Sequence, residues 1–308
     1  MTTPSSRSAA ALGAASLLLA LAACAGTADE ARSDPAVSVS VSGSPAAETF
    51  TSLEERHAAT LGVYAIDTGS GHTVEYRANE RFGYTSTIKA LSAAAVLDAA
   101  TDDQLNDPIA VGPEDIVAYA PVMEEHVGST VTLGEVADAA VRFSDNTAGN
   151  LLVEYLGGPA GLEESLRGIG DETTNVDRIE PGLNEVAPGD DRDTSTPRAL
   201  ATSLFEYALG GALNAQDEEV LIGMLKGNTT GDALIRSGAP AGWEIGDKTG
   251  AGAYGTRNDV AVAFPADGGA PIVIAVLSKR GEPDAKYDDA LIADAAEVAF
   301  GVLPSQRG

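Results

Sequence analysis

The stretch Thr85–Leu97, TSTIKALSAAAVL, is almost entirely small and apolar, which is typical of a helix that is buried on nearly all sides. A polar pair interrupts it, because Ser86 and Lys89 stand three residues apart and a helix places them on one face. A buried lysine needs a partner, since its charge is costly to remove from water. Two interpretations follow: Lys89 extends from a core helix to the surface, or it activates Ser86 as a nucleophile.

The segments on either side of this helix predict an α+β fold. LGVYAIDTGSGHTVEYR (61–77) is typical of two strands around a Gly-Ser-Gly turn, and a long helical region follows to about residue 225. Strand patterns return in WEIGDKTGA (243–251), NDVAVAFP (258–265) and PIVIAVLSK (271–279), before a closing helix at 287–300. We therefore expect an antiparallel sheet built from both termini and flanked by helices, with an inserted all-helical region and a cleft between the two parts.

The N-terminal residues predict export. Arg7 precedes an apolar run, AAALGAASLLLALAAC (9–24), which is too short to span a membrane as a mature helix. Its end resembles the processing box of bacterial lipoproteins, in which cleavage precedes a cysteine that is then lipidated. An ordinary signal peptide is the alternative. Cys24 is the only cysteine, so no internal disulfide is expected.

The domain plan follows from these patterns. We expect a lipoprotein-type signal peptide at 1–23, a lipid anchor at Cys24 with a flexible tether to residue 48, and a catalytic domain at 49–305. The segment SLEERHAA favours a first helix that starts at Ser52, with Glu55 completing a capping box. The mature protein is then exported, either on the outer face of the cell membrane or secreted.

Composition excludes several classes of function. The 308 residues carry a formal net charge of −27, which argues against binding nucleic acid or an anionic membrane surface by charge. The only membrane contact expected is the lipid anchor. The three histidines, His57, His72 and His126, lack the spacing of metal ligands. We therefore expect no metal and no cofactor.

Three further motifs follow the Ser86/Lys89 pair along the chain. They are Ser-Asp-Asn at 144–146, Glu-Pro-Gly-Leu-Asn at 180–184 and Lys-Thr-Gly at 248–250. Each has an ordinary explanation by itself: an N-cap, a solvated loop, and a strand end. Their combination, in this order, is much more specific than any one of them.

Together these motifs resemble those of the class A serine β-lactamases, and the resemblance spans about residues 50–303. It implies the β-lactamase/transpeptidase-like fold, a monomer, and hydrolysis of β-lactam antibiotics through an acyl-enzyme. It implies that Ser86, Lys89, Ser144 and Glu180 are catalytic, with Ser86 as the nucleophile. Whether Lys89 or Glu180, through a water, is the base for acylation stays open.

The resemblance also implies which residues bind the substrate. The backbone N–H groups of Ser86 and Ala251 would hold the oxyanion. The complete set of expected substrate-binding residues is Asn146, Asn184, Lys248, Thr249, Gly250, Ala251, Arg257 and Tyr119. Thr85 and Gly252 stand where carbapenem-hydrolysing members carry a disulfide, so nothing supports that activity. We expect a preference for penicillins.

Two expectations concern the loop that carries Glu180. Arg178 and Asp193 match the ion pair that closes this loop in the family, and the Glu180–Pro181 bond is expected to be cis. Two rival functions are a penicillin-binding DD-peptidase, which lacks the glutamate loop, and a non-hydrolysing lipoprotein that senses β-lactams or cell-wall fragments. The presence of Glu180 and Asn184 favours hydrolysis over both.

Overall fold

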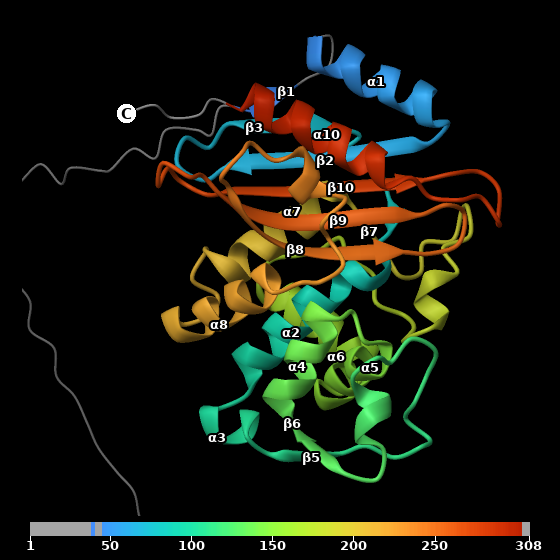
Figure 1. The fold of residues 1–308 in the computed structure, drawn as a ribbon, viewed down its shortest axis with the longest axis vertical. Helices are drawn as coiled ribbons and strands as arrows, with labels where there is room; N and C mark the ends of the chain where they lie inside the picture. Colours follow the sequence, from blue (N-terminus) through green and yellow to red (C-terminus); the bar gives the residue numbers. More distant parts are fainter. Residues whose placement is uncertain (1–37, 41–44, 304–308) are drawn as a thin grey trace, which may run out of the picture. The chain divides into compact units, whose positions relative to one another are not determined.

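The computed structural model describes residues 38–40 and 45–303 (Figure 1). The strands are β1 (Ser38–Ser40), β2 (Thr60–Asp67), β3 (Thr73–Tyr76), β4 (Phe82–Gly83), β5 (Pro108–Ala110), β6 (Thr130–Thr132), β7 (Thr194–Ser195), β8 (Glu244–Ala251), β9 (Arg257–Phe264) and β10 (Ile272–Lys279). The α-helices are α1 (Pro45–His57), α2 (Ile88–Ala99), α3 (Asp102–Leu105), α4 (Leu133–Arg142), α5 (Asn146–Tyr155), α6 (Pro159–Gly168), α7 (Pro197–Ala208), α8 (Ala215–Lys226), α9 (Ile235–Gly238) and α10 (Asp289–Val302). Short 3₁₀ turns are η1 (Thr85–Thr87), η2 (Met123–His126) and η3 (Gly182–Asn184).

The main sheet combines both ends of the chain, as predicted. Its strand order is β1-β3-β2-β10-β9-β8, and β2 pairs with β10 in antiparallel register from Thr60↔Lys279 to Asp67↔Ile272. The blue and orange strands of Figure 1 therefore lie side by side although they are distant in sequence. The expected antiparallel sheet is confirmed, and one edge adds a short parallel pairing of β1 with β3.

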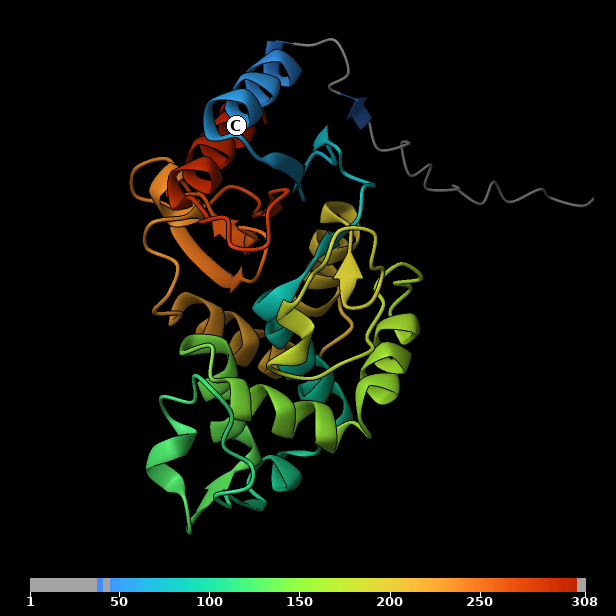
Figure 2. The ribbon, with the colours of Figure 1, turned by 90° about the vertical axis from the view of Figure 1, so that its right-hand side faces the viewer.

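Helices cover both faces of this sheet. Helices α1 and α10 pack on one face and α7 packs on the other, where the helical region follows (Figure 2). Successive side chains of β10 point to opposite faces of the sheet, so the strand contributes to two hydrophobic cores. Val273, Ala275 and Leu277 belong to the core on the α7 side, and their neighbours in the strand belong to the core on the α10 side. The inserted region, expected to be all helical, also contains the small two-stranded sheet β5/β6 and the short strand β7.

The first helix begins earlier than the sequence suggested. The capping box was wrong: Ser52 lies inside α1, and its hydroxyl donates to the carbonyl of Glu48 at 2.9 Å. The reason is packing, since Ala46, Phe50 and Leu53 are buried at helical spacing and extend the apolar stripe upstream. Both β1 and the start of α1 therefore lie within the segment predicted as a tether.

The predicted signal peptide and the lipid anchor at Cys24 lie outside the described residues, as do residues 304–308. In the part of the chain that the structure describes, no helix is both long enough and apolar enough to span a bilayer. The opening stretch forms η1 and α2, and α2 is buried from Ile88 to Leu97, as its sequence predicts. This burial places Lys89 in the interior between the sheet and the helical region, while Ser86, one turn earlier, stays partly exposed.

Candidate active site

A cavity of about 390 Å³ contains most of the predicted site residues. It is lined by Ser86, Tyr119, Ser144, Asn146, Asn184, Thr230, Thr249, Gly250, Ala251, Arg257 and Tyr287. The other three predicted residues, Lys89, Glu180 and Lys248, are buried and contact residues of the lining. All four catalytic candidates are thus brought together, although they come from three separate segments of the chain.

The nucleophile candidate lies on η1, directly before α2. Lys89, one turn later and 1% exposed, donates from Nζ to Ser86 Oγ at 2.8 Å. The same ammonium group donates to Asn146 Oδ1 at 2.6 Å and to the Ser144 carbonyl at 3.1 Å. Lys89 therefore does not reach the surface, and the snorkelling interpretation was wrong. Its buried charge is instead held by polar groups around Ser86.

Glu180 completes this polar cluster. Its Oε1 accepts from Ser86 Oγ at 3.2 Å and lies 2.8 Å from Lys89 Nζ, and its Oε2 accepts from Asn184 Nδ2 at 2.5 Å. The backbone of Glu180 is held on both sides by Asn150, whose amide accepts from the Glu180 N–H at 2.8 Å and donates to its carbonyl at 3.0 Å. The sequence analysis missed Asn150, since it stands alone on α5 four residues after the Ser-Asp-Asn motif.

A second buried lysine lies on the other side of the cavity. Lys248 donates from Nζ to Ser144 Oγ at 3.0 Å. Burial, and then the nearby charge of Lys89, lower the pKa of Lys248 from 10.5 to about 7. Burial also lowers the pKa of Lys89, although Glu180 opposes that effect. Both amines are therefore easier to deprotonate than a surface lysine, and the lowered pKa of Lys248 suits proton transfer near neutral pH.

Strand β8 packs closely against the turn η1 that carries Ser86. A Cβ on Gly250 would lie 2.1 Å from Thr85 Oγ1, so only glycine permits this approach. Thr85 itself has a φ of 51°, a strained value for a β-branched residue. Asn258 on β9 holds the preceding backbone, because its amide donates to the carbonyls of Gly83 at 2.7 Å and Tyr84 at 3.1 Å. Strain of this kind persists where surrounding contacts impose it.

The mouth of the cavity carries two exposed aromatic rings. Tyr119 is 61% exposed, and its carbonyl accepts from the Asn146 N–H at 2.9 Å. Tyr287 is 49% exposed, and its ring lies 4.7 Å from the guanidinium carbon of Arg257. Arg257 also binds Asp289, with Nε 2.6 Å from Oδ1. A ligand carboxylate would therefore share this guanidinium with a resident acid.

Sequence reasoning missed two residues of the lining, Tyr287 and Thr230. Thr230 Oγ1 lies 2.6 Å from Thr249 Oγ1, so it extends the hydroxyl surface of the Lys-Thr-Gly segment. Neither residue belongs to a motif, and tertiary packing alone brings each to the cavity. Among the described residues no cluster of three His, Cys, Asp or Glu side chains is arranged to hold a metal ion.

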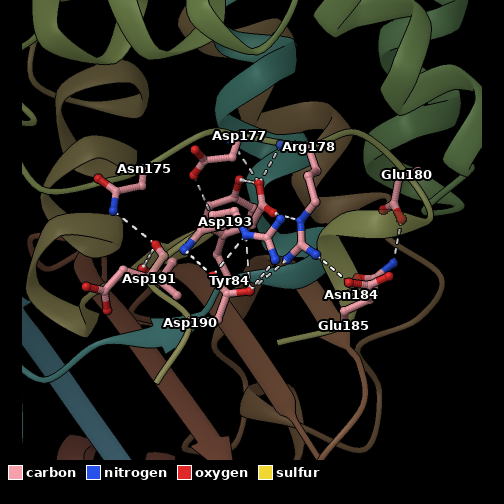
Figure 3. A network of polar contacts seen from close by, with 12 residues as sticks. Tyr84, Asn175, Asp177, Arg178, Glu180, Asn184, Glu185, Asp190, Asp191 and Asp193 are labelled. Carbon is pink, nitrogen blue, oxygen red and sulfur yellow. Dashed lines mark hydrogen bonds and ion pairs between the residues drawn. The ribbon is translucent and has the colours of Figure 1, made fainter. Parts of the chain in front are cut away.

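The loop between α6 and β7 positions Glu180, and its two ends are joined by the predicted ion pair. Arg178 Nε donates to Asp193 Oδ2 at 2.5 Å, and Asp193 Oδ1 accepts the backbone N–H groups of Asp177 and Arg178 and the hydroxyl of Tyr84 (Figure 3). Asp193 is fully buried. The Glu180–Pro181 bond is cis, as predicted.

Comparisons with known proteins agree with this geometry. The sequence model of the Beta-lactamase enzyme family matches residues 45–303. The chain is 55% identical to a beta-lactamase of Bacillus amyloliquefaciens over 83% of each protein, and 54% identical to one of Amycolatopsis lactamdurans over 84% of this chain and 86% of that one.

Solved structures give the same result. The crystal structure of a halotolerant bacterial beta-lactamase is 55% identical, with a TM-score of 0.81 over 82% of this chain and 97% of that chain. A class A beta-lactamase from Clostridium kluyveri is 47% identical, with a TM-score of 0.81 over 83% and 97%. Fold, motif order and similarity over nearly the whole described chain therefore agree, and the protein belongs to the beta-lactamase enzyme family as a class A β-lactamase.

Proposed function

We propose that the protein hydrolyses β-lactam antibiotics through an ester formed on Ser86, and so confers resistance to them. The observation that carries this proposal is the position of Ser86 Oγ, 2.8 Å from Lys89 Nζ and 3.2 Å from Glu180 Oε1. A serine hydroxyl is a weak nucleophile and needs an adjacent base. Here an amine and a carboxylate both lie within hydrogen-bond distance of it.

Acylation uses the groups that face the cavity. Ser86 Oγ attacks the lactam carbonyl carbon, and its proton passes to Lys89 or, through a water, to Glu180. The Ser86 and Ala251 N–H groups stabilise the oxyanion, an effect worth about 3–4 kcal/mol for a single donor elsewhere. When the lactam C–N bond breaks, Ser144 gives its proton to the departing nitrogen and takes one back from the Lys248 ammonium that is hydrogen-bonded to it. The proton removed from Ser86 then restores Lys248, so that the nitrogen gains one proton for the one that Ser86 lost.

Deacylation is assigned to Glu180. The ester on Ser86 is stable until a water is deprotonated beside it, and the Glu180 carboxylate is close to that position. Asn184 fixes the Glu180 side chain and Asn150 its backbone. The proton that Glu180 takes from the water returns to Ser86 Oγ when the ester C–O bond breaks, which regenerates the enzyme.

Substrate carboxylates are assigned to the cationic side of the cavity. Lys248, Thr249 and Arg257 converge there with Ser144, and Arg257 adds charge-assisted hydrogen bonds. Asn146 is assigned to the amide of the substrate side chain, because its own amide lies in the lining and is oriented by Lys89. Tyr119 and Tyr287 form apolar contacts at the mouth.

A steady-state assay with a chromogenic cephalosporin tests the proposed reaction. We expect many turnovers per enzyme molecule. A single stoichiometric burst followed by no further product would favour the penicillin-binding rival. No reaction at all from folded protein would favour the non-catalytic rival.

The buried lysine on β8 predicts a pH dependence. The ammonium form of Lys248 binds the substrate carboxylate, and this form is lost as the pH rises through its lowered pKa of about 7. We therefore expect kcat/KM to fall on the alkaline side well below the ordinary lysine pKa of 10.5. Lys248→Arg keeps its charge, so the fall should move to higher pH. If kcat/KM of that variant falls at the same pH as in the parent, the fall is due to the deprotonation of another group, such as Lys89.

We also propose that Cys24 carries the lipid anchor of the mature protein. A single acyl chain gives only marginal membrane binding at about 0.8 kcal/mol per buried methylene, whereas two or more anchor stably. Cys24→Ser should move activity from the membrane fraction to the medium, or block processing. Equal partitioning of the variant and the parent between these fractions would contradict the anchor.

A further inference from the structure

Most lysines and arginines in the described part of this acidic chain are ion-paired, and the exceptions are informative. Within residues 45–303, every lysine and arginine lies within 4.0 Å of a carboxylate except Arg81, Lys248, Lys279, Arg280 and Lys286. In a protein of net charge −27, cations without such a partner are unusual. Lys248 is buried next to the lining of the active-site cavity, where it donates to Ser144 Oγ at 3.0 Å.

Three of the remaining four cations surround one other cavity. Arg81, Lys279 and Arg280 line a space of about 500 Å³, which also touches Thr60 at the start of β2. Its opposite wall is the segment 186–191, which follows η3 on the loop that carries Glu180. The volume is within the range of about 300–1,000 Å³ that is usual for small-molecule sites. The cavity lies outside the active-site lining and shares no residue with it.

The lining also contains three acidic residues, as many as its cations, but two of the three have ion-pair partners outside it. Glu80, Asp190 and Asp191 also face the cavity. Glu80 is already paired with Arg77 at 2.9 Å, and Asp190 with Arg192 at 2.7 Å, and neither arginine belongs to the lining. Asp191 makes no ion pair with any described residue. Two of the three carboxylates are therefore partnered from outside the lining, although Glu80 shares Arg77 with Glu54.

Neutral groups hold two of the cations in place. Arg81 donates to Thr194 Oγ1 at 3.0 Å and to the Thr173 carbonyl at 2.9 Å. Lys279 donates to the Arg81 carbonyl at 2.7 Å, and its ammonium lies 4.6 Å from the centre of the Phe82 ring. These contacts position the charges without neutralising them. The site is therefore organised before any ligand arrives, which lowers the cost of binding.

The third cation is the one best suited to contact a ligand. The guanidinium of Arg280 makes no hydrogen bond or ion pair with the described residues, and its side chain is only partly exposed. A free guanidinium offers several donors in a planar fork that matches carboxylate and phosphate oxygens. Arg280 follows the last residue of β10, so a ligand bound to it would lie between the sheet and the segment 186–191.

We propose that this cavity is a second ligand site, which binds a small oxyanion of the carboxylate or phosphate class. The bound anion bridges Arg280 and Lys279 to the segment 186–191. It thereby stabilises the end of the loop whose other part carries Glu180. This inference does not use the chemistry of Ser86 and holds whether or not the proposed hydrolysis is correct.

Hydrogen exchange measured by mass spectrometry tests the site on the whole protein. Sodium phosphate, sodium succinate and sodium chloride are compared at equal ionic strength, so that general screening is the same in each. We expect phosphate or succinate to slow exchange of the amides in 186–191, with saturation, relative to chloride. The two anions together identify which oxyanion is preferred. Exchange is measured peptide by peptide. Anion binding near Lys248 in the active site would therefore appear in the peptides that contain Ser144 and Ala251, separately from the segment 186–191.

Two variants that each remove one positive charge test whether Arg280 contacts the anion. Arg280→Gln should weaken the apparent affinity seen at 186–191 about tenfold, the effect of losing one hydrogen bond to a charged group. Lys286→Gln is the control, since Lys286 is exposed, unpaired and outside the cavity. It should leave the affinity unchanged. Equal weakening in both variants would mean that only net charge matters and would overturn the proposal, as would the absence of protection by either anion.

Discussion

Glu180→Ala is expected to react with a penicillin and then to keep it as an ester for a long time. The side chain of Glu180 lies 3.2 Å from Ser86 Oγ, where the ester forms, and it is 3% exposed. Lys89 is already engaged by Ser86, Ser144 and Asn146, so it is less free to activate a water. A positioned general base contributes about 10²–10⁴-fold, and deacylation should slow by that factor.

Intact-mass spectrometry measures this directly. The Glu180→Ala protein should carry a persistent adduct on the peptide that contains Ser86, while the parent shows little at steady state. Ser86→Ala should show none. Glu185→Ala is a matched control, because it removes a 70% exposed carboxylate from the same loop and should still turn over.

Other results of that experiment would change the assignment. A folded Glu180→Ala protein that takes no label would mean that Glu180 also serves acylation, which bears on the open choice between it and Lys89. A parent enzyme that itself stays acylated for hours would favour a penicillin-binding protein. Rapid turnover by Glu180→Ala would show that another group activates the water.

Asp193→Asn is expected to cause the largest loss of stability among single polar changes in this loop. The carboxylate is fully buried and accepts from the backbone of Asp177 and Arg178, from Arg178 Nε and from Tyr84 (Figure 3). An asparagine cannot accept all of these bonds, and it leaves the Arg178 guanidinium, 17% exposed, without its main counter-charge. Breaking a buried pair in this way costs about 3–5 kcal/mol.

Urea unfolding at neutral pH measures the change. The midpoint should fall with little change in slope, and the melting temperature should fall by roughly 10 °C. Asp138→Asn is the control: its partner Arg142 lies one turn away on α4, and both side chains are more than a third exposed, so the loss should be about 0.5 kcal/mol or less. Equal destabilisation in the two variants would mean that the buried pair contributes no more than a surface one.

Turnover should also fall in Asp193→Asn. The loop that it closes carries Glu180, whose position depends on Asn184 and Asn150. A loop that opens more often presents the base less often. The expected result is a lower kcat with normal acylation of Ser86. A variant that is destabilised but deacylates at the parent rate would separate stability from catalysis.

The parts of the fold that were predictable are those with local patterns. Strands β2 and β8–β10 followed from their β-branched and apolar runs bounded by glycine turns. Helix α2 followed from its small apolar residues. The four motifs identified the centre of the site: three stand at the end of a strand or at the start of a helix, and the fourth lies in the loop between α6 and β7.

The remaining features depend on packing between distant segments. The start of α1 was missed because the capping pattern at Ser52 suggested a later start. The helix begins earlier because Phe50 packs against the sheet, a contact that the sequence alone does not reveal. No sequence motif identifies Asn150, Thr230 or Tyr287. Each contributes to the site only by contacting a residue that is distant in sequence and is brought close by folding. The parallel edge strand β1 has three residues and no periodicity to detect.

The pairing of β2 with β10 has a consequence for the order in which the chain can fold. Thr60 pairs with Lys279, so the central pair of the sheet joins segments at opposite ends of the chain. While the protein is being synthesised, β2 emerges early and has no partner on one side until β10, the last strand of the sheet in chain order, is complete. Closing such a large loop is slow, and an unpaired apolar strand is prone to aggregate meanwhile. Truncation before β10 should therefore give a chain that aggregates rather than a smaller folded enzyme.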